Sequence, residues 1–308
     1  MCTYICRFVI PMRKISYTVP PTLDGSSVAA VLRSHGFSTA LLRSLKKRYG
    51  ALCRNGCPVR TVDPVHTGDI VAVELNTDGA TAPPSAEKAV IVYADRDILV
   101  VNKRAGMAMY ETYNHHGNAL SNAVAAAGFD GPFRPIYRLD KDTSGLVVLA
   151  RHRLSAAKLA GRVQKDYYAV VPGAYAGNGT VDAPIAHCPD STVKRCVDPA
   201  GVRAVTHWEA LGQQGGRTLL RVQLETGRTH QIRVHFAHLG TPLVGDSLYG
   251  TAPIGARHLL HCKTIRLMHP VREEPVAFDC PFPSDMEEWN QCLPTAPTTS
   301  LPASCCPP

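Results

Sequence analysis

The stretch YRLDKDTSGLVVLA, from Tyr137 to Ala150, joins two contrasting halves. Its first half carries four charges, at Arg138, Asp140, Lys141 and Asp142. Its second half is a turn-like Thr-Ser-Gly followed by an apolar, strand-like run. Charges are costly to bury against a core strand, but at the mouth of a rigid strand they are a common way to build a site. The stretch therefore predicts a functional loop that enters a buried strand.

Apolar runs like this one recur through residues 89–290. They are AVIVYAD, DILVVNK, GLVVLAR, YYAVVPG and LLRVQLE. Only a few helix-like segments separate them, such as GNALSNAVAAAG, and the chain has no GxGxxG or P-loop pattern. This irregular mixture favours an α+β domain with a mixed, largely antiparallel sheet and flanking helices over a doubly wound α/β fold.

Upstream, residues 13–76 have the pattern of a small separate α/β domain. RKISYTV predicts an opening strand. The next segment predicts a helix with Asp24 as its N-cap and Gly36 as its stop, and the following one a helix from Ser38 to Gly50. Short strands around a hairpin-type Asn-Gly turn complete the domain.

Two short helices followed by a small twisted sheet resemble the RNA-binding domain first described in a small-subunit ribosomal protein. The matching residues are SVAAVLRSHGFSTALLRSLKK, the Asn-Gly turn and TGDIVAVEL. The resemblance implies RNA contacts at Arg43, Lys46 and Lys47. A generic helical hairpin with solvated lysines is the alternative. Residues 77–88 are predicted to form a polar linker, and residues 291–308 a disordered tail.

Composition limits the classes of partner. The 308 residues carry a formal net charge of +8, which suits a polyanion such as RNA, DNA or an anionic membrane, or simply a solvated basic face. No segment approaches the roughly 20 apolar residues that span a bilayer. The N-terminus lacks a charged start and a small-residue cleavage site, which argues against a signal peptide and favours a cytoplasmic protein. The 11 scattered cysteines do not form a disulfide framework.

Two kinds of residue cluster could be read as metal sites. Cys2/Cys6 and Cys53/Cys57 form two close pairs, and three histidines lie at 230, 235 and 238. A structural zinc site needs four ligands, and neither a coherent second pair nor a matching carboxylate or thiolate is evident. We therefore interpret the cysteines as ordinary thiols and the histidines as hydrogen-bonded structural residues, and expect no metal.

Two further stretches extend the opening motif. They are QKDYYAVVPG, Gln164 to Gly173, and LETGRTHQIRVHFAHLGTPLVGDSLYG, Leu224 to Gly250. With the first stretch they resemble the RluA-type pseudouridine synthases, whose motifs read HRLDxxTSG, KxY and TGRxHQIRxH. LLHCKTIRLMHP, Leu259 to Pro270, resembles the closing motif of that family. The resemblance spans about Ala89 to Pro283.

The resemblance implies isomerisation of uridine in RNA, in which the base is detached, turned and rejoined through carbon 5. It assigns Asp140 as the catalytic carboxylate, either a nucleophile or the base of a glycal route. Arg233, on an expected helix, would keep that carboxylate ionised, and Tyr167 would lie against the base with its hydroxyl placed for the proton step. Arg138 would fill the gap left by the flipped uridine, and Arg228 would contact RNA. The resemblance implies no cofactor.

Two positions depart from the family pattern. Tyr137 replaces the usual His, which would alter an RNA contact, and Arg104 replaces a Pro, which would loosen a turn. RNA, either ribosomal or transfer RNA, is the expected partner of a monomer, with no DNA or membrane. Two other functions stay open: a glycosidase-like pair of Asp140 and Asp142 on one strand, and a non-catalytic RNA-binding protein.

Overall fold

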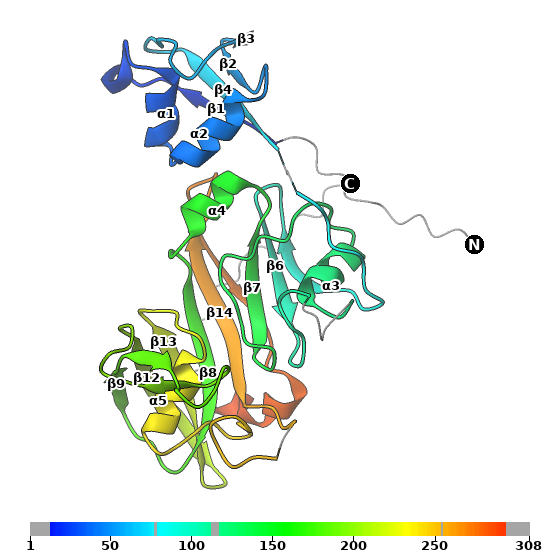
Figure 1. Cartoon of the computed structure of the whole chain (residues 1–308), viewed down its shortest axis with the longest axis vertical. Coiled ribbons are helices and arrows are strands. Elements are labelled where there is room, and N and C mark those ends of the chain that lie inside the picture. The colour runs from blue at the N-terminus through cyan, green and yellow to red at the C-terminus, as the bar shows by residue number, and fades with distance from the viewer. Residues whose placement is uncertain (1–12, 77–78, 112–116, 254, 294–308) are drawn as a thin grey trace, which may run out of the picture. The chain divides into compact units, whose positions relative to one another are not determined.

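The computed structural model describes residues 13–76, 79–111, 117–253 and 255–293. The chain divides into two compact units. The first comprises Met1–Asp166 with His261–Pro281, and the second Tyr167–Leu260 with Phe282–Pro308 (Figure 1). The predicted tail therefore falls mostly outside the described residues, as do Cys2 and Cys6.

The first unit begins with a four-stranded sheet in the order β1-β4-β2-β3. Its strands are β1 (Arg13–Thr18), β2 (Leu52–Arg54), β3 (Cys57–Pro58) and β4 (Ile70–Leu75). Asn55 and Gly56 both have positive φ, 51° and 86°, as the two central residues of a type I′ hairpin turn require. The Asn-Gly hairpin predicted from the sequence is confirmed.

Two helices, α1 (Val28–Ser34) and α2 (Thr39–Lys46), accompany this sheet. Ser38 caps α2 as predicted, because its Oγ accepts the Leu41 N–H at 3.2 Å. The prediction of Asp24 as the cap of α1 is wrong. Ser27 caps that helix, and the Asp24 carboxylate instead accepts the Thr67 N–H at 2.8 Å, beyond the short 3-10 helix η1 (Pro21–Leu23).

The apolar side chains of α1, α2 and this sheet form one core, which also includes Leu154 and contacts Val271. Beside it, Arg13 donates two hydrogen bonds to the buried Asp97 carboxylate, at 2.8 and 3.0 Å. Burial alone would raise the pKa of Asp97, but the hydrogen bonds from His152 and Arg13 outweigh burial and lower it. The N-terminal segment is therefore tied to the rest of its unit by an apolar core and a buried ion pair.

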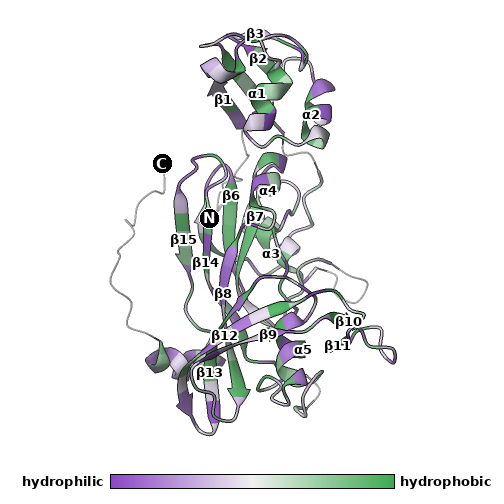
Figure 2. Cartoon of the chain, turned by 90° about the vertical axis from the view of Figure 1, so that its left-hand side faces the viewer, coloured by the Kyte–Doolittle hydropathy of each residue, from purple (hydrophilic) through white to green (hydrophobic). Residues whose placement is uncertain are grey.

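The remainder of the first unit contains strands and two helices. They are β5 (Val90–Ala94), β6 (Ile98–Lys103), β7 (Ser144–Ala150), β14 (Leu260–Met268, entering the unit at His261), β15 (Pro275–Asp279), α3 (Leu120–Ala126) and α4 (Arg153–Leu159). β7 is buried along its whole length and is coloured as hydrophobic in Figure 2. It pairs antiparallel with β6 and parallel with β14. A strand buried on both faces explains why its sequence is continuously apolar.

The second unit is built around β12 (Val205–Gln214), which pairs antiparallel with β9 (Asn178–Asp182) and β13 (Arg217–Leu224). Its other elements are most of β8 (Gln164–Pro172), the hairpin β10 (Ile185–His187) and β11 (Arg195–Val197), α5 (Gln231–His238) and the 3-10 helix η2 (Ser284–Cys292). Trp289 and Met286 of η2 are fully buried in an apolar cluster with Tyr168 of β8.

The larger sheet has nine strands, ordered β5-β6-β7-β14-β8-β13-β12-β9, with β15 paired to β14. Its one parallel pairing among those described, β7 with β14, makes it mixed and largely antiparallel, so the predicted α+β class is confirmed. Within the described ranges, no helix is both long enough and apolar enough to cross a bilayer.

Candidate active site

Asp140 lies in the loop that enters β7. Its carbonyl accepts the Thr143 N–H at 3.2 Å, which closes a tight turn at Lys141 and Asp142. Leu139 is buried beside it, whereas the Asp140 side chain is half-buried. The predicted placement of charges at the mouth of a buried strand is therefore confirmed. The prediction that Asp140 and Asp142 lie on one strand as an acid/base pair is wrong, because both residues precede β7.

A fully buried lysine holds this loop in place. The Lys103 ammonium, at the end of β6, donates to the carbonyls of Arg104 (3.0 Å), Met107 (2.8 Å) and Lys141 (2.9 Å). An ammonium has three donors, so these three carbonyls satisfy them. Lys103 thereby links Lys141, the residue after Asp140, to the end of β6.

The strand behind the loop allows no side chain at Gly145. Its φ is +115°, and a Cβ there would lie 2.2 Å from the Cys262 carbonyl oxygen and 2.6 Å from the Cys262 nitrogen. Next to it, Ser144 Oγ and His261 Nδ1 form a buried hydrogen bond of 2.8 Å, and His261 Nε2 lies 3.2 Å from Cys280 Sγ. β7 and β14 are thus joined closely just after the Asp140 loop.

Tyr137, one departure from the family pattern, has a structural role. Its hydroxyl donates to the Leu146 carbonyl at 2.9 Å, and the Lys165 ammonium lies 4.7 Å from the centre of its ring. Burial lowers the pKa of Lys165. A tyrosine at this position therefore holds the loop against β7 and places its ring beside a half-buried lysine.

Arg104, the other departure, does not leave a loose turn. Its guanidinium binds both carboxylate oxygens of Glu87, at 2.6 Å and 2.7 Å. Glu87 belongs to the predicted linker, which also makes a backbone hydrogen bond to α3 through Ser85, and Ala89 directly after the linker makes a second one. The described part of that segment is thus attached to the first unit.

Tyr167 and Tyr168 are neighbours on β8 and are 6% and 7% exposed. Tyr168 packs with Val170 in the cluster around Trp289, and its ring meets that of Phe282 edge-on at 5.4 Å. Because adjacent side chains in a strand point to opposite faces, Tyr167 faces away from this cluster. This is the register that the sequence predicted.

Arg233 is buried on α5, the helix predicted for it. It donates to both carboxylate oxygens of Asp246, at 2.7 and 2.9 Å, and its guanidinium lies 5.0 Å from the Tyr249 ring centre. Burial alone would raise the pKa of Asp246, but the hydrogen bonds and charge of Arg233 lower it. The pairing of Arg233 with Asp140 would join the two units and stays a prediction.

The positively charged residues predicted to bind RNA are exposed. Arg43 and Lys46 line one groove of about 550 Å³ together with Arg33, and Lys47 follows at the end of α2. Arg138 is exposed in the Asp140 loop. Arg228 is exposed before α5, where its Nε donates to the Arg203 carbonyl at 3.1 Å.

Comparison with known proteins identifies the family. The family model described as RNA pseudouridylate synthase matches residues 97–238. An RNA pseudouridine synthase of Bacillus subtilis, YjbO, is 37% identical over 266 residues, which cover 82% of this chain and 94% of that protein. This chain belongs to the RNA pseudouridylate synthase family.

Two further relatives agree with this assignment. The synthase is 36% identical to ribosomal large subunit pseudouridine synthase D of Xanthomonas campestris pv. campestris, over 89% of this chain and 91% of that one. Among solved structures, human RNA pseudouridylate synthase domain containing 1 aligns with a TM-score of 0.54 at 27% identity. That alignment covers 68% of the synthase and 89% of the human chain.

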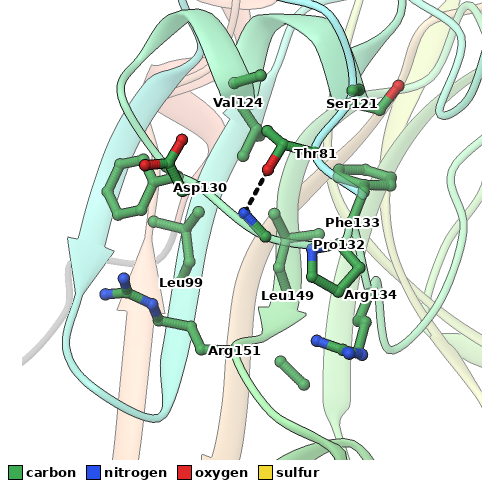
Figure 3. Close-up of a pocket in the computed structure, with 15 residues that line it drawn as sticks. Thr81, Leu99, Ser121, Val124, Asp130, Pro132, Phe133, Arg134, Leu149 and Arg151 are labelled. Atoms are coloured by element: carbon green, nitrogen blue, oxygen red, sulfur yellow. Dashed lines mark hydrogen bonds between the residues drawn. The ribbon is translucent and has the colours of Figure 1, made fainter. Parts of the chain in front are cut away.

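One cavity of the synthase lies between α3, β6 and β7 but is too small for a base. Its volume is about 30 Å³, and Thr81 Oγ1 at its edge accepts the Gly131 N–H at 2.7 Å (Figure 3). By this measure of volume, one water molecule needs about 10–15 Å³. Asp140 is not among its lining residues, so we do not assign this cavity to the reaction.

All three histidines of α5 and its N-cap were predicted to be hydrogen-bonded structural residues, and His230 and His235 have such partners in the synthase. His235 is buried between Thr206 Oγ1 (2.8 Å) and the Ala183 carbonyl (3.0 Å), and burial lowers its pKa. His230 Nδ1 lies 2.8 Å from the Tyr249 hydroxyl, whereas His238 is exposed.

One group of three potential metal ligands occurs in the described part of the chain: Asp95, Asp97 and His269. Arg272 donates to Asp95 at 3.1 Å, and Arg13 donates to Asp97. These guanidiniums already compensate both carboxylates, so we interpret the group as an ion-pair network.

Replacing Lys103 with methionine is expected to lower the free energy of unfolding by about 3 kcal/mol or more, because three carbonyls, among them that of the buried Met107, lose the donor that a fully buried ammonium supplies. Chemical denaturation measures the change. The matched control is Lys141→Met in the same loop, whose exposed side chain predicts a change within about 0.5 kcal/mol. Equal losses in the two variants would contradict the role of the Lys103 ammonium.

Proposed function

We propose that this enzyme isomerises specific uridines in the RNA of the large ribosomal subunit, with Asp140 as the catalytic carboxylate. The observation that carries the proposal is the Asp140 loop. It presents a half-exposed carboxylate at the mouth of a buried strand, and Lys103 fixes the backbone beside it. A rigidly placed carboxylate supports either covalent attack or proton abstraction at the ribose.

The ribosomal target is supported by a relative that spans almost the whole chain. The Xanthomonas protein named ribosomal large subunit pseudouridine synthase D aligns over 89% of this chain, a larger share than the residues 97–238 that the family model matches. A transfer RNA target is the alternative. The two are distinguished by the RNA that is modified.

Arg233 and Tyr167 complete the proposed site. In this proposal Arg233, oriented by its two hydrogen bonds to Asp246, keeps the catalytic carboxylate ionised. Burial, followed by the positive charge of Arg233, lowers the pKa of His258 to about 3, so His258 is neutral at physiological pH and adds no competing charge. Tyr167 stacks on the flipped base, and its hydroxyl serves the proton loss at carbon 5.

The direct test is to map pseudouridines in total RNA from cells with and without the protein. We expect at least one uridine of large-subunit RNA to lose its pseudouridine when the protein is absent. Loss confined to transfer RNA would support the alternative target. An unchanged map, with RNA binding retained, would favour a non-catalytic RNA-binding protein.

Tyr167→Phe is expected to bind RNA but to stall after the base has been rejoined, because the ring remains and the hydroxyl is lost. Single-turnover release of tritium from carbon 5 of labelled uridine measures this step. Tyr168→Phe is the matched control, since the same change on the other face should cost stability of about 1 kcal/mol or less. Normal release by the Tyr167 variant with loss in the Tyr168 variant would reverse the assignment.

Neutralising the groove on α2 with Arg43→Gln and Lys46→Gln is expected to weaken RNA binding. Each lost phosphate contact lowers the slope of log K against log salt by about 0.7–0.9. A salt titration of binding measures the slope. Lys14→Gln with Lys88→Gln is the charge-matched control, since it also removes two exposed positive charges. The same slope change in both double variants would mean that net charge, and not the groove, determines binding.

A further inference from the structure

Two cysteines meet on one small hairpin of the second unit. β10 and β11 pair antiparallel with Ala186 opposite Cys196, and the Cys188 N–H extends the ladder by donating to the Lys194 carbonyl at 3.2 Å. Paired residues in an antiparallel ladder share a face, and so do residues two apart in one strand. Cys188 and Cys196 therefore lie on the same face of the hairpin, as diagonal neighbours.

Both thiols are free and half-buried, so they are open to small reagents. The Cys188 thiol lies close enough to raise the pKa of Cys196 by hydrogen bonding, with a smaller contribution from burial. Since the thiolate is the reactive form of cysteine, the raised pKa of Cys196 makes this thiol the slower of the two to react.

The hairpin is connected to Arg233. The backbone N–H of Arg195, the neighbour of Cys196, donates to the Tyr249 hydroxyl at 3.0 Å. The Tyr249 ring lies 5.0 Å from the Arg233 guanidinium, and its hydroxyl lies 2.8 Å from His230 Nδ1. The other neighbour of Cys196, Val197, packs in an apolar cluster that includes Val234.

We propose that Cys188 and Cys196 are a redox site, whose reversible disulfide changes the position of Arg233 and so lowers the activity of the enzyme. The effect on activity rests on the proposed function, in which Arg233 supports the catalytic carboxylate. The disulfide itself does not depend on that function.

The chemistry needs a peroxide as oxidant. The Cys188 thiolate attacks one oxygen of hydrogen peroxide, the O–O bond breaks, and with one proton Cys188 sulfenic acid and water are formed. The Cys196 thiol then attacks the Cys188 sulfur, which forms the S–S bond and releases a second water. Two equivalents of a small thiol reduce the bond, regenerate both cysteines and leave as their own disulfide.

Forming this bond requires movement of the hairpin. The two thiols are close enough to hydrogen-bond, but a disulfide needs its sulfurs about 2.05 Å apart. It also needs its Cβ atoms about 3.5–4.5 Å apart, whereas the Cβ atoms of diagonal neighbours in a regular ladder are separated by somewhat less than about 7–8 Å. Closure must therefore draw the Cys188 end of β10 toward Cys196. Since Arg195 adjoins Cys196, the same movement displaces the N–H that holds Tyr249 beneath Arg233.

The test treats the full chain with hydrogen peroxide, blocks the remaining thiols and maps the disulfides by mass spectrometry after tryptic digestion. Cleavage after Lys194 and Arg195 separates the two cysteines, so a bond between them appears as two linked peptides. We expect this link in the wild type, its loss on reduction, and its absence in Cys188→Ser and Cys196→Ser. No link in the wild type would overturn the proposal.

Isomerase activity is the first of two readouts for the effect of the disulfide on the enzyme. Oxidised wild type is expected to lose isomerase activity about tenfold or more, since a displacement of about 1 Å in a site can cost up to 100-fold. Reduction should restore the activity, and Cys188→Ser should keep it under peroxide. Equal loss in Cys188→Ser would overturn the switch.

Hydrogen exchange of residues 230–250 gives a readout that does not depend on activity. We expect faster exchange around Tyr249 in the oxidised wild type and no change in Cys188→Ser. Unchanged exchange in a fully linked protein would overturn the proposed movement. An inactive reduced enzyme would instead count against the proposed function, while the link and the exchange would still decide the redox site.

Discussion

Asp140→Asn is expected to lower the rate of uridine isomerisation by about 100-fold or more, because groups that form bonds or move protons in the transition state contribute on this scale. The amide keeps the shape of the side chain but loses its charge and its nucleophilic oxygen. RNA binding should stay near the wild-type level. Tritium release from carbon 5 measures turnover, and a filter-binding titration measures affinity.

The control for this variant is Asp142→Asn, which removes a second half-buried carboxylate from the same turn. It should keep most of the activity, since the resemblance assigns chemistry to Asp140 alone. Turnover above a few per cent in Asp140→Asn would end the assignment of Asp140 as the catalytic group. Equal losses in both variants would point to the charge of the loop instead.

Gly145→Ala is expected to reduce the free energy of unfolding by about 4 kcal/mol or more, or to prevent folding altogether. Its Cβ would lie 2.2 Å from the carbonyl oxygen of Cys262, which is backbone and cannot rotate away. The variant must therefore push β7 and β14 apart just behind the Asp140 loop. Thermal and chemical denaturation measure the loss.

A second glycine of the same unit shows how much of the lost stability comes from backbone strain and how much from the steric contact. Gly161 also has positive φ, +70°, but a Cβ there meets nothing within 4 Å. Gly161→Ala should therefore cost only the conformational strain, about 1–2 kcal/mol. If the two variants lost equal stability, the close approach to Cys262 would not be what requires a glycine.

Much of the fold was predictable because the spacing of apolar residues and the residue types that form turns and caps are local properties of the sequence. The continuous apolar run of β7, the Asn-Gly hairpin and the Ser38 cap each follow from a few adjacent residues. Asp24 failed as a cap because Ser27, three residues later, offered the same chemistry, and the Asp24 carboxylate found Thr67 from a distant segment. Which of two good caps is used depends on tertiary contacts that a local pattern does not contain.

The position of a site residue was predictable where the motif that contains the residue also contains the neighbours that position it. The loop position of Asp140 followed from the charges around it. The buried Lys103 was missed, although a charge that ends an apolar strand run was a usable signal. Asp246 and Tyr249 were missed because their contact with Arg233 spans a loop of the second unit, and nothing in their own sequence marks them as its partners.

The parallel pairing of β7 with β14 also affects how the chain is made. Ser144 and His261, which join these strands, are 117 positions apart, and the intervening chain includes Tyr167–Leu260 of the second unit. At about 5–20 residues per second, a ribosome needs on the order of ten seconds to add them. During that interval one edge of β7 has no partner strand, and an unpaired apolar edge invites aggregation. Slow codons or chaperone binding in this interval would therefore affect the yield of active enzyme more than the same delay after residue 281.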